Sequence, residues 1–266
     1  MSLNIVVLAK QVPDTRNVGK DAMKEDGTIN RAALPAIFNP EDLNALEQAL
    51  RLKDANPGSK VTILTMGLPR AAEVIREAIF RGADGGIVLT DRVLGGADTL
   101  ATSYSLAQAV KKIENYDIIL GGRQAIDGDT AQVGPQISEH LNIPVISYAQ
   151  KIEIDGDSVV VERQYDDRYH VLKAKMPCLV TALAELNEPR YMTPGGIFDA
   201  CNAEITVWGR DKLVDVEDSN LGLKGSPTQI AKASDKVRKG AGEKVTLDPA
   251  ESVDYIIGKL KEKHVI

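Results

Sequence analysis

Short apolar runs alternate with helix-like stretches through the first 141 residues of this 266-residue chain. The run 3–9 (LNIVVLA) is apolar throughout, as in a strand that is buried on both faces. Asn39-Pro40-Glu41-Asp42 has the composition of a helix start, with Asn39 at the capping position and Pro40 in the first turn. Alternation at this spacing predicts parallel βαβ units, and therefore an α/β three-layer sandwich with a mainly parallel sheet. The predicted strands are 3–9, 60–66, 87–89 and 116–120, and the other predicted helices are 71–81, 101–113 and 130–141.

The pattern changes after Pro144. Two strand-like runs, 145–154 and 158–163, flank a glycine turn, and runs 169–174 and 178–183 follow, which predicts antiparallel or mixed additions to the sheet. Residues 208–250 are polar and too poor in apolar side chains to build a core, so we expect them to be disordered or to lie along another surface. A helix is predicted at 250–263. We therefore expect a nucleotide-binding α/β domain at 1–208 and an extended arm with a terminal helix at 209–266.

Composition excludes several classes of protein. The net charge is −6, from 32 basic and 38 acidic residues, and the absence of a long basic run argues against nucleic acid as a partner. No window of 18 apolar residues predicts a membrane span, and no basic leader precedes the first strand, so we expect a cytoplasmic protein. Three dispersed histidines and two cysteines outside any CxxC pattern give no metal site. Neither G-x-G-x-x-G nor a P-loop is present.

The strongest functional motif is the segment 121–130 (GGRQAIDGDT), which joins the strand 116–120 to a helix. Ligands in open parallel sheets bind beyond the carboxyl ends of strands, and a helix N-terminus offers free N–H groups to a phosphate. Arg123 adds a planar donor group for an anion. The alternative is an ordinary loop in which glycine permits the turn and Asp-Thr caps the helix.

Two further helix starts are expected at the same edge of the sheet. Segment 94–103 offers Gly95 and Gly96 for close approach and hydroxyls at Thr99, Thr102 and Ser103, although Asp98 would compete with a phosphate for the helix dipole. Its alternative role is capping by Asp98 alone, and capping alone is also the alternative for the segment 39–42. Three such loops at one edge favour a joint nucleotide site.

These motifs together resemble the β subunit of electron transfer flavoproteins over nearly the whole chain. The resemblance lies in the segments 6–14 (VVLAKQVPD), 39–53 (NPEDLNALEQALRLK), 122–135 (GRQAIDGDTAQVGP) and 186–191 (LNEPRY). It implies an adenine nucleotide between the first strand and the Gly-Arg-Gln loop. The cofactor-binding residues that it implies are Leu8, Asn39, Pro40, Glu41, Asp42, Met66, Asp98, Thr99, Thr102, Gly122, Arg123, Gln124, Ala125, Ile126, Asp127, Gly128, Asp129, Thr130, Ala131, Gln132 and Val133.

Two branches of this family differ in that nucleotide. The housekeeping branch holds AMP as a structural ligand, and the electron-bifurcating branch holds a second FAD, whose extra phosphate needs further donors. Segments 95–102 and 127–135 are similar to the bifurcating branch. That resemblance implies that NADH reduces this FAD, and that electrons pass to ferredoxin or flavodoxin and, through the α-subunit FAD, to a flavin-dependent dehydrogenase of acyl-CoA or hydroxy-acid type. The flavin would carry the chemistry, so whether this subunit alone is an enzyme stays open.

The resemblance also implies a role for Arg123, which would either stabilise anionic reduced flavin or clamp a phosphate or carboxylate.

Partner contacts are implied by the resemblance as well. The arm would wrap the α subunit. A module without redox function, like the universal stress proteins that share this sheet architecture, is a rival that the arm and the 186–191 segment disfavour. That segment is similar to the family's partner-docking loop, with a plain connector as its alternative, and it comprises Leu186, Asn187, Glu188, Pro189, Arg190 and Tyr191.

Overall fold

A computed structural model describes residues 1–14, 34–228, 242 and 244–266. The chain divides into two compact units, Met1–Ala231 and Lys232–Ile266. The second unit contributes one described helix, α6 (Pro249–Glu262), close to the predicted 250–263. The first unit therefore extends beyond position 208, where the sequence suggested a boundary.

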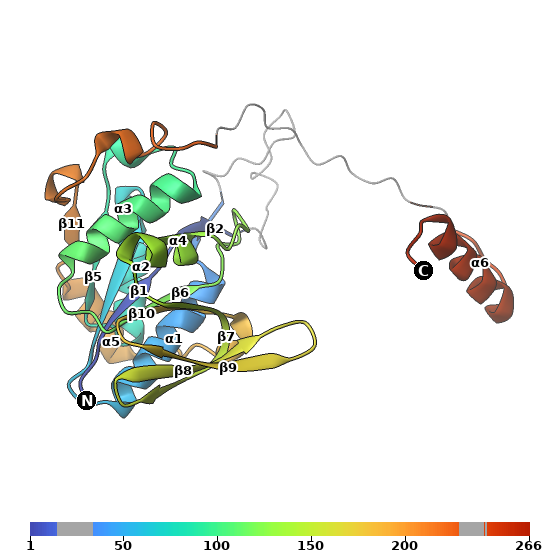
Figure 1. Ribbon diagram of the computed structural model, residues 1–266, viewed down its shortest axis with the longest axis horizontal. Coiled ribbons are helices and arrows are strands. Elements are labelled where there is room, and N and C mark those ends of the chain that lie inside the picture. The colour runs from blue at the N-terminus through green and yellow to red at the C-terminus, as the bar shows by residue number, and fades with distance from the viewer. Residues whose placement is uncertain (15–33, 229–241, 243) are drawn as a thin grey trace. The chain divides into compact units, whose positions relative to one another are not determined.

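The first unit is built on a nine-stranded sheet with the order β11-β5-β4-β1-β6-β10-β7-β8-β9 (Figure 1). All neighbouring strands from β11 to β7 pair in parallel, and β8 and β9 add an antiparallel hairpin beside β7. This confirms the mainly parallel sheet with antiparallel additions. The strands are β1 (Asn4–Leu8), β4 (Lys60–Met66), β5 (Gly85–Leu89), β6 (Ile118–Gly122), β7 (Val145–Asp155), β8 (Ser158–Gln164), β9 (Tyr169–Lys175), β10 (Cys178–Ala182) and β11 (Thr206–Trp208).

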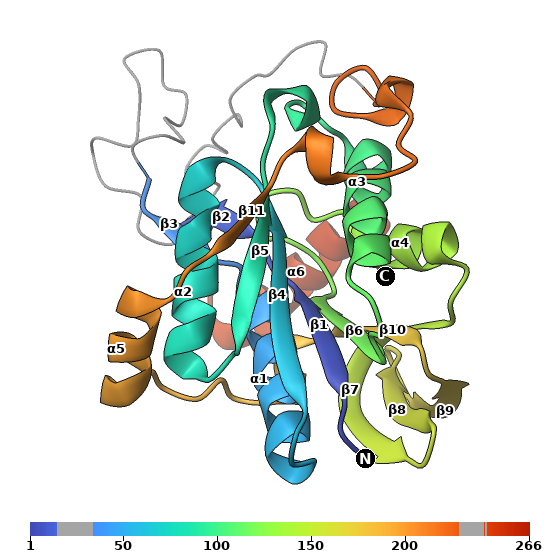
Figure 2. The same cartoon turned by 90° about the vertical axis from the view of Figure 1, so that its left-hand side faces the viewer.

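Helices cover both faces of the sheet, so the three-layer arrangement is also confirmed (Figure 2). One apolar core joins the sheet to α1 (Pro40–Ala55), α2 (Ala72–Arg81) and α5 (Pro194–Asn202). The other core joins it to α3 (Thr99–Lys112) and α4 (Val133–Leu141). A separate two-stranded ribbon, β2 (Gln11–Pro13) with β3 (Ala36–Phe38), follows β1.

Helix α4 starts three residues later than the predicted 130–141. Asp129 and Ala131 have φ angles of 49° and 53°, which are left-handed and incompatible with a continuing right-handed helix. The loop after β6 is correspondingly longer than the sequence suggested.

The polar segment after Trp208 packs on the first unit through a few apolar side chains. Leu213 and Leu221 are buried in the same core as α3 and α4, and β11 pairs with β5. Residues 209–228 thus build no core of their own and lie along the surface formed by α3 and α4, which agrees with one of the two predicted alternatives. Two widely spaced leucines anchor this segment, and such sparse anchors leave no hydrophobic periodicity in the sequence.

Candidate functional site

The sheet has a topological switch point between β1 and β6. From β1 the chain builds β4 and β5 on one side, with α1 and α2 on one face, and then crosses to β6 on the other side. Crevices beyond the carboxyl ends of strands at such points are the usual ligand sites of open α/β sheets. Leu8 ends β1 at this crevice, Met66 ends β4 beside it, and Gly122 ends β6.

Asn39 occupies the capping position of α1, but its side chain makes no capping hydrogen bond. Its Nδ2 donates to the Gln124 carbonyl at 2.9 Å, and its Oδ1 accepts from the Ile126 N–H at 3.1 Å. The side chain is fully buried. The simple capping interpretation of Asn39 is therefore wrong, and its amide instead fixes the backbone of the loop after β6.

The next two side chains of the motif also bind that loop. Asp42 accepts from the Gly122 N–H at 2.9 Å and from the Lys10 N–H at 2.8 Å. Glu41 accepts from the Gln124 N–H at 3.0 Å. The first turn of α1 thus holds the loops after β1 and β6 together at the switch point, from behind the crevice.

Arg123 forms an ion pair with Glu41, with 2.8 Å between Nη2 and Oε1. Its guanidinium also lies 5.8 Å from the centre of the Tyr148 ring, and its Nε is buried without a hydrogen-bond partner. Burial raises the pKa of Glu41, while Arg123 and the Gln124 N–H oppose that rise. This contact fits the carboxylate-clamp alternative for Arg123.

The second half of the loop is held in a strained conformation. Gly128 and Asp129 donate their N–H groups to the Ala125 carbonyl, and Asp129 and Ala131 are two of the seven non-glycine residues with positive φ in the described chain. Such strain is concentrated at ligand sites in proteins. Gln132 gives α4 no side-chain cap, so the N–H groups of Val133 and Gly134 in its first turn receive no capping bond from it, and Pro135 has no N–H.

The second predicted loop meets the first. The Thr99 hydroxyl donates to Gln132 Oε1 at 3.1 Å, which joins the start of α3 to the start of α4. Asp98 caps α3 by accepting from Leu100 N and Ala101 N at 2.9 and 3.0 Å. The capping alternative for Asp98 is therefore confirmed, and its carboxylate already occupies the dipole end of α3.

Not every hydroxyl of that turn is accessible. Ser103 is fully buried and donates to the Leu100 carbonyl at 2.9 Å, so it offers nothing to a ligand. Thr102 is half-buried in the same turn. Thr99 and Thr102 are the hydroxyls of this turn that are partly exposed, and Thr99 would have to release Gln132 before it could donate to a ligand.

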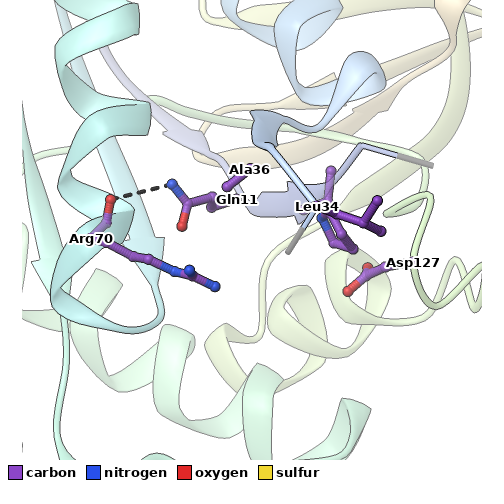
Figure 3. Close-up of a pocket in the computed structure, with 7 residues that line it drawn as sticks. Gln11, Leu34, Ala36, Arg70 and Asp127 are labelled. Atoms are coloured by element: carbon purple, nitrogen blue, oxygen red, sulfur yellow. Dashed lines mark hydrogen bonds between the residues drawn. The ribbon is translucent and has the colours of Figure 1, made fainter. Parts of the chain in front are cut away.

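A shallow hollow of about 170 Å³ opens beside the loop that joins β6 to α4 (Figure 3). It contains Asp127, whose Oδ1 accepts from Lys10 Nζ at 2.7 Å. Lys10, Gln11 and Arg70 were not predicted as site residues: Arg70 lies outside any motif, and the segment 6–14 does not show which of its side chains faces the hollow. The lining comprises Gln11, Val12, Pro13, Leu34, Ala36, Arg70 and Asp127.

The 186–191 segment is anchored on the middle of α1. Asn44 Nδ2 donates to the Asn187 carbonyl at 2.6 Å, and Asn187 Nδ2 returns a bond to the Asn44 carbonyl at 3.0 Å. Glu47 accepts from the Arg190 N–H and from Arg190 Nε, at 3.1 and 2.8 Å. The segment is thus rigidly held, more so than a plain connector requires.

Next to this anchored segment, large apolar side chains face solvent. Tyr191 is 91% exposed and Phe198, on α5, is 71% exposed. Exposed aromatic side chains on a rigid support are typical of protein-binding surfaces.

Gly122→Ala is expected to destabilise the chain by about 1–3 kcal/mol. An added Cβ would lie 2.5 Å from Asp42 Oδ1 and 2.8 Å from Asp42 N, so the contact between β6 and α1 must open. Gly128→Ala is the matched control in the same loop, because its added Cβ meets nothing within 4 Å. Urea unfolding of the two variants measures the difference, and equal midpoints would show that the close approach is unimportant.

Asp42 should give stability an unusual pH dependence. Burial raises its pKa from the ordinary 3.8 to about 7, despite the hydrogen bonds that it accepts. Between these values the folded chain holds the proton more tightly than the unfolded chain, so the contribution of Asp42 to stability falls as pH rises from about 4 to about 7. Asp42→Asn cannot ionise and should flatten that part of the curve. Urea unfolding from pH 4.5 to 8 tests this, and parallel curves for both proteins would contradict it.

The described residues contain no helix long and apolar enough to cross a membrane. Within the same residues, no three potential metal-ligating side chains cluster. The family model "Electron transfer flavoprotein domain" matches residues 26–213.

Several curated proteins are similar to the chain over nearly its full length. The electron transfer flavoprotein subunit beta of Clostridium acetobutylicum is 51% identical over 264 residues, which cover 99% of this chain and 100% of that protein. The caffeyl-CoA reductase-Etf complex subunit CarD of Acetobacterium woodii is 47% identical over 265 residues, with the same coverage. The acryloyl-CoA reductase electron transfer subunit gamma of Anaerotignum propionicum is 46% identical over 270 residues, again with 99% and 100% coverage.

Proposed function

Since the chain belongs to the electron transfer flavoprotein family, as a relative of its β subunits, we propose that its switch-point crevice binds FAD in an electron-bifurcating complex. The observation that carries the proposal is the contact between Thr99 and Gln132, which brings two helix starts to one place. A single phosphate, as in AMP, needs one of them. A pyrophosphate can use the hydroxyls at α3 and the uncapped N–H groups of α4 together.

The residues present fit an anionic nucleotide. The first turn of α4 has no side-chain cap, so it leaves backbone donors for an anion. Asn39, Glu41 and Asp42 would then act indirectly, by holding the loop that contacts the ligand. Asp98 would bind no phosphate, because its carboxylate already caps α3.

When bound, FAD would supply hydride acceptance from NADH and one-electron transfer to ferredoxin or flavodoxin and to the FAD of the α subunit. The names of the caffeyl-CoA and acryloyl-CoA reductase relatives support a flavin-dependent acyl-CoA dehydrogenase as the final partner, with a hydroxy-acid enzyme as the alternative. The chain's own part is to bind the cofactor, orient it and exclude water. We place this complex in the cytoplasm.

Partner contacts follow from the exposed surfaces. The anchored 186–191 segment, with Tyr191, would dock the dehydrogenase. Helix α6 exposes Val253, Ile256 and Ile257 and would dock on the α subunit, as the sequence predicts for the arm and terminal helix at 209–266. A β subunit that holds AMP without bifurcation is the second candidate, favoured by the Arg123–Glu41 clamp, which removes part of a charge that could tune a flavin.

The test is the FAD content of the purified αβ heterodimer, where we expect two FAD per complex. Thr99→Val with Thr102→Val should weaken FAD binding at the β site by about tenfold to a hundredfold, because hydrogen bonds to a charged phosphate are lost. Ser103→Ala is the control from the same turn, and it should keep full FAD content because Ser103 faces the core. One FAD and one AMP per wild-type heterodimer would establish the second candidate instead.

A further inference from the structure

Asp42 is a buried carboxylate that lies between the two strands of the switch point. Its exposed fraction is 7%. Its Oδ1 accepts from the Gly122 N–H at 2.9 Å, and its Oδ2 accepts from the Lys10 N–H at 2.8 Å. Gly122 ends β6, and Lys10 follows the end of β1. The carboxylate is therefore joined, through one peptide group on each side, to both strands that border the crevice.

Among the described residues no basic side chain forms an ion pair with this carboxylate. The two cations nearest to it along these loops are engaged by other acids. Lys10 Nζ lies 2.7 Å from Asp127 Oδ1, and Arg123 Nη2 lies 2.8 Å from Glu41 Oε1. With every group ionised, these four side chains and Asp42 carry two positive and three negative charges, a net charge of −1. Protonation of Asp42 alone makes the group neutral.

The surroundings of Asp42 leave room for that proton. Asp42 accepts hydrogen bonds from Asn39, Gly122 and Lys10, and the roughly four lone-pair sites of a carboxylate leave one for a proton. Burial raises the pKa of Asp42 to about 7, and the hydrogen bonds that it accepts oppose this rise without cancelling it. A further negative charge nearby always favours the neutral form of an acid. An anion in the crevice would therefore favour protonation of Asp42.

The neighbouring acid on α1 is less suited to this role. Glu41 has Arg123 as its ion-pair partner and accepts from the Gln124 N–H, although burial and the like charge of Glu185 raise its pKa. Protonation of Glu41 would break the ion pair. Asp42 can take up a proton without losing a cation.

We propose that Asp42 takes up one proton from solvent when the crevice binds an anionic nucleotide, and that it thereby offsets one charge of the phosphates. The proton goes to a carboxylate oxygen, and no other bond forms or breaks. The inference rests on the proposed nucleotide site but not on which nucleotide fills it, because AMP and FAD both carry phosphate. Since the coupling is reciprocal, the affinity for the nucleotide falls as pH rises and the proton becomes scarce.

The experiment uses the αβ heterodimer, dialysed free of its β-site nucleotide, with ADP-ribose as the probe. ADP-ribose carries the adenine and pyrophosphate of FAD, and its phosphates do not titrate near neutral pH. Calorimetry in two buffers of different ionisation enthalpy counts the protons taken up, and infrared difference spectra detect the carbonyl band of a newly protonated carboxyl. Asp42→Asn removes the titrating group. Glu73→Gln is the control, because it removes an exposed carboxylate on α2.

We expect wild type and Glu73→Gln to take up a proton on binding and to show the infrared band. Their Kd for ADP-ribose should rise about tenfold from pH 7 to pH 8.5, while that of Asp42→Asn changes by less than about twofold, without proton uptake or band. Equal proton uptake in wild type and Asp42→Asn overturns the assignment, as does a wild type that binds no ADP-ribose. If Asp42→Asn does not fold, wild-type binding without proton uptake or band overturns it. One FAD and one AMP per purified heterodimer would contradict FAD at this site and leave the role of Asp42 intact.

Discussion

Asn39→Ala is expected to release the loop after β6 and to strip most of the nucleotide from the β site. The substitution leaves the Gln124 carbonyl and the Ile126 N–H buried without partners. Each unsatisfied buried group costs about 1–3 kcal/mol, so the loop must either pay about 2–6 kcal/mol or move toward water. Movement of the loop would displace Arg123 and the start of α4 from the crevice, and the affinity for the ligand would fall as a result.

The competing expectation for Asn39 is loss of a helix cap, which costs about 1 kcal/mol and leaves nucleotide content unchanged. Asn56→Ala provides the matched control, since Asn56 bonds the Leu52 carbonyl at the other end of α1. Asn39→Asp keeps the acceptor for Ile126 and should lie between wild type and alanine. Urea unfolding and nucleotide extraction from each heterodimer decide the matter. If Asn39→Ala retains as much nucleotide as Asn56→Ala, Asn39 stabilises only the fold around it and does not hold the nucleotide loop in place.

The fold could be predicted because its signals are local. Strand β4 matched the predicted 60–66 residue for residue, since a continuous apolar run followed by Gly67 leaves little choice of ends. The order of strands and helices then follows from the handedness of βαβ units. The start of α4 was predicted three residues too early, because no residue type in the sequence marks the left-handed backbone at Ala131.

The candidate site was predicted as a set of loops, but the roles of its residues were not. Buried Asn44, Glu47 and Gln48 have the appearance of a solvated face of α1 in sequence. Their partners lie about a hundred residues or more away, at Asn187, Arg190 and the Ile152 carbonyl. Spacing along one helix cannot reveal such contacts, because they depend on how β7 and the 186–191 segment pack against α1.

Glu47→Ala should free the 186–191 segment and slow electron transfer to the partner dehydrogenase. Burial raises the pKa of Glu47, but hydrogen bonds from Arg190 and Arg51 outweigh it and hold that pKa below its ordinary value. The carboxylate therefore stabilises the fold at neutral pH, and this contribution is lost as pH falls through the lowered pKa. Breaking a buried pair costs about 3–5 kcal/mol, an upper limit here because Arg190 is partly exposed and retains Asp54.

Loss of this anchor should act on docking and not on the cofactor. Without Glu47, Tyr191 and its neighbours would sample many positions, so the partner must order them on binding and its KM should rise about tenfold or more. FAD content should stay at the wild-type value, because Glu41 and Asp42, one to two turns earlier on α1, still hold the nucleotide loop. Asp167→Ala is the control, since its pair with Arg168 is exposed on both sides and contributes little. Steady-state reduction of the dehydrogenase at several partner concentrations measures the effect. A KM that rises equally in Asp167→Ala would show that the effect is not specific to the Glu47 anchor. A loss of FAD in Glu47→Ala would show that this part of α1 also supports cofactor binding.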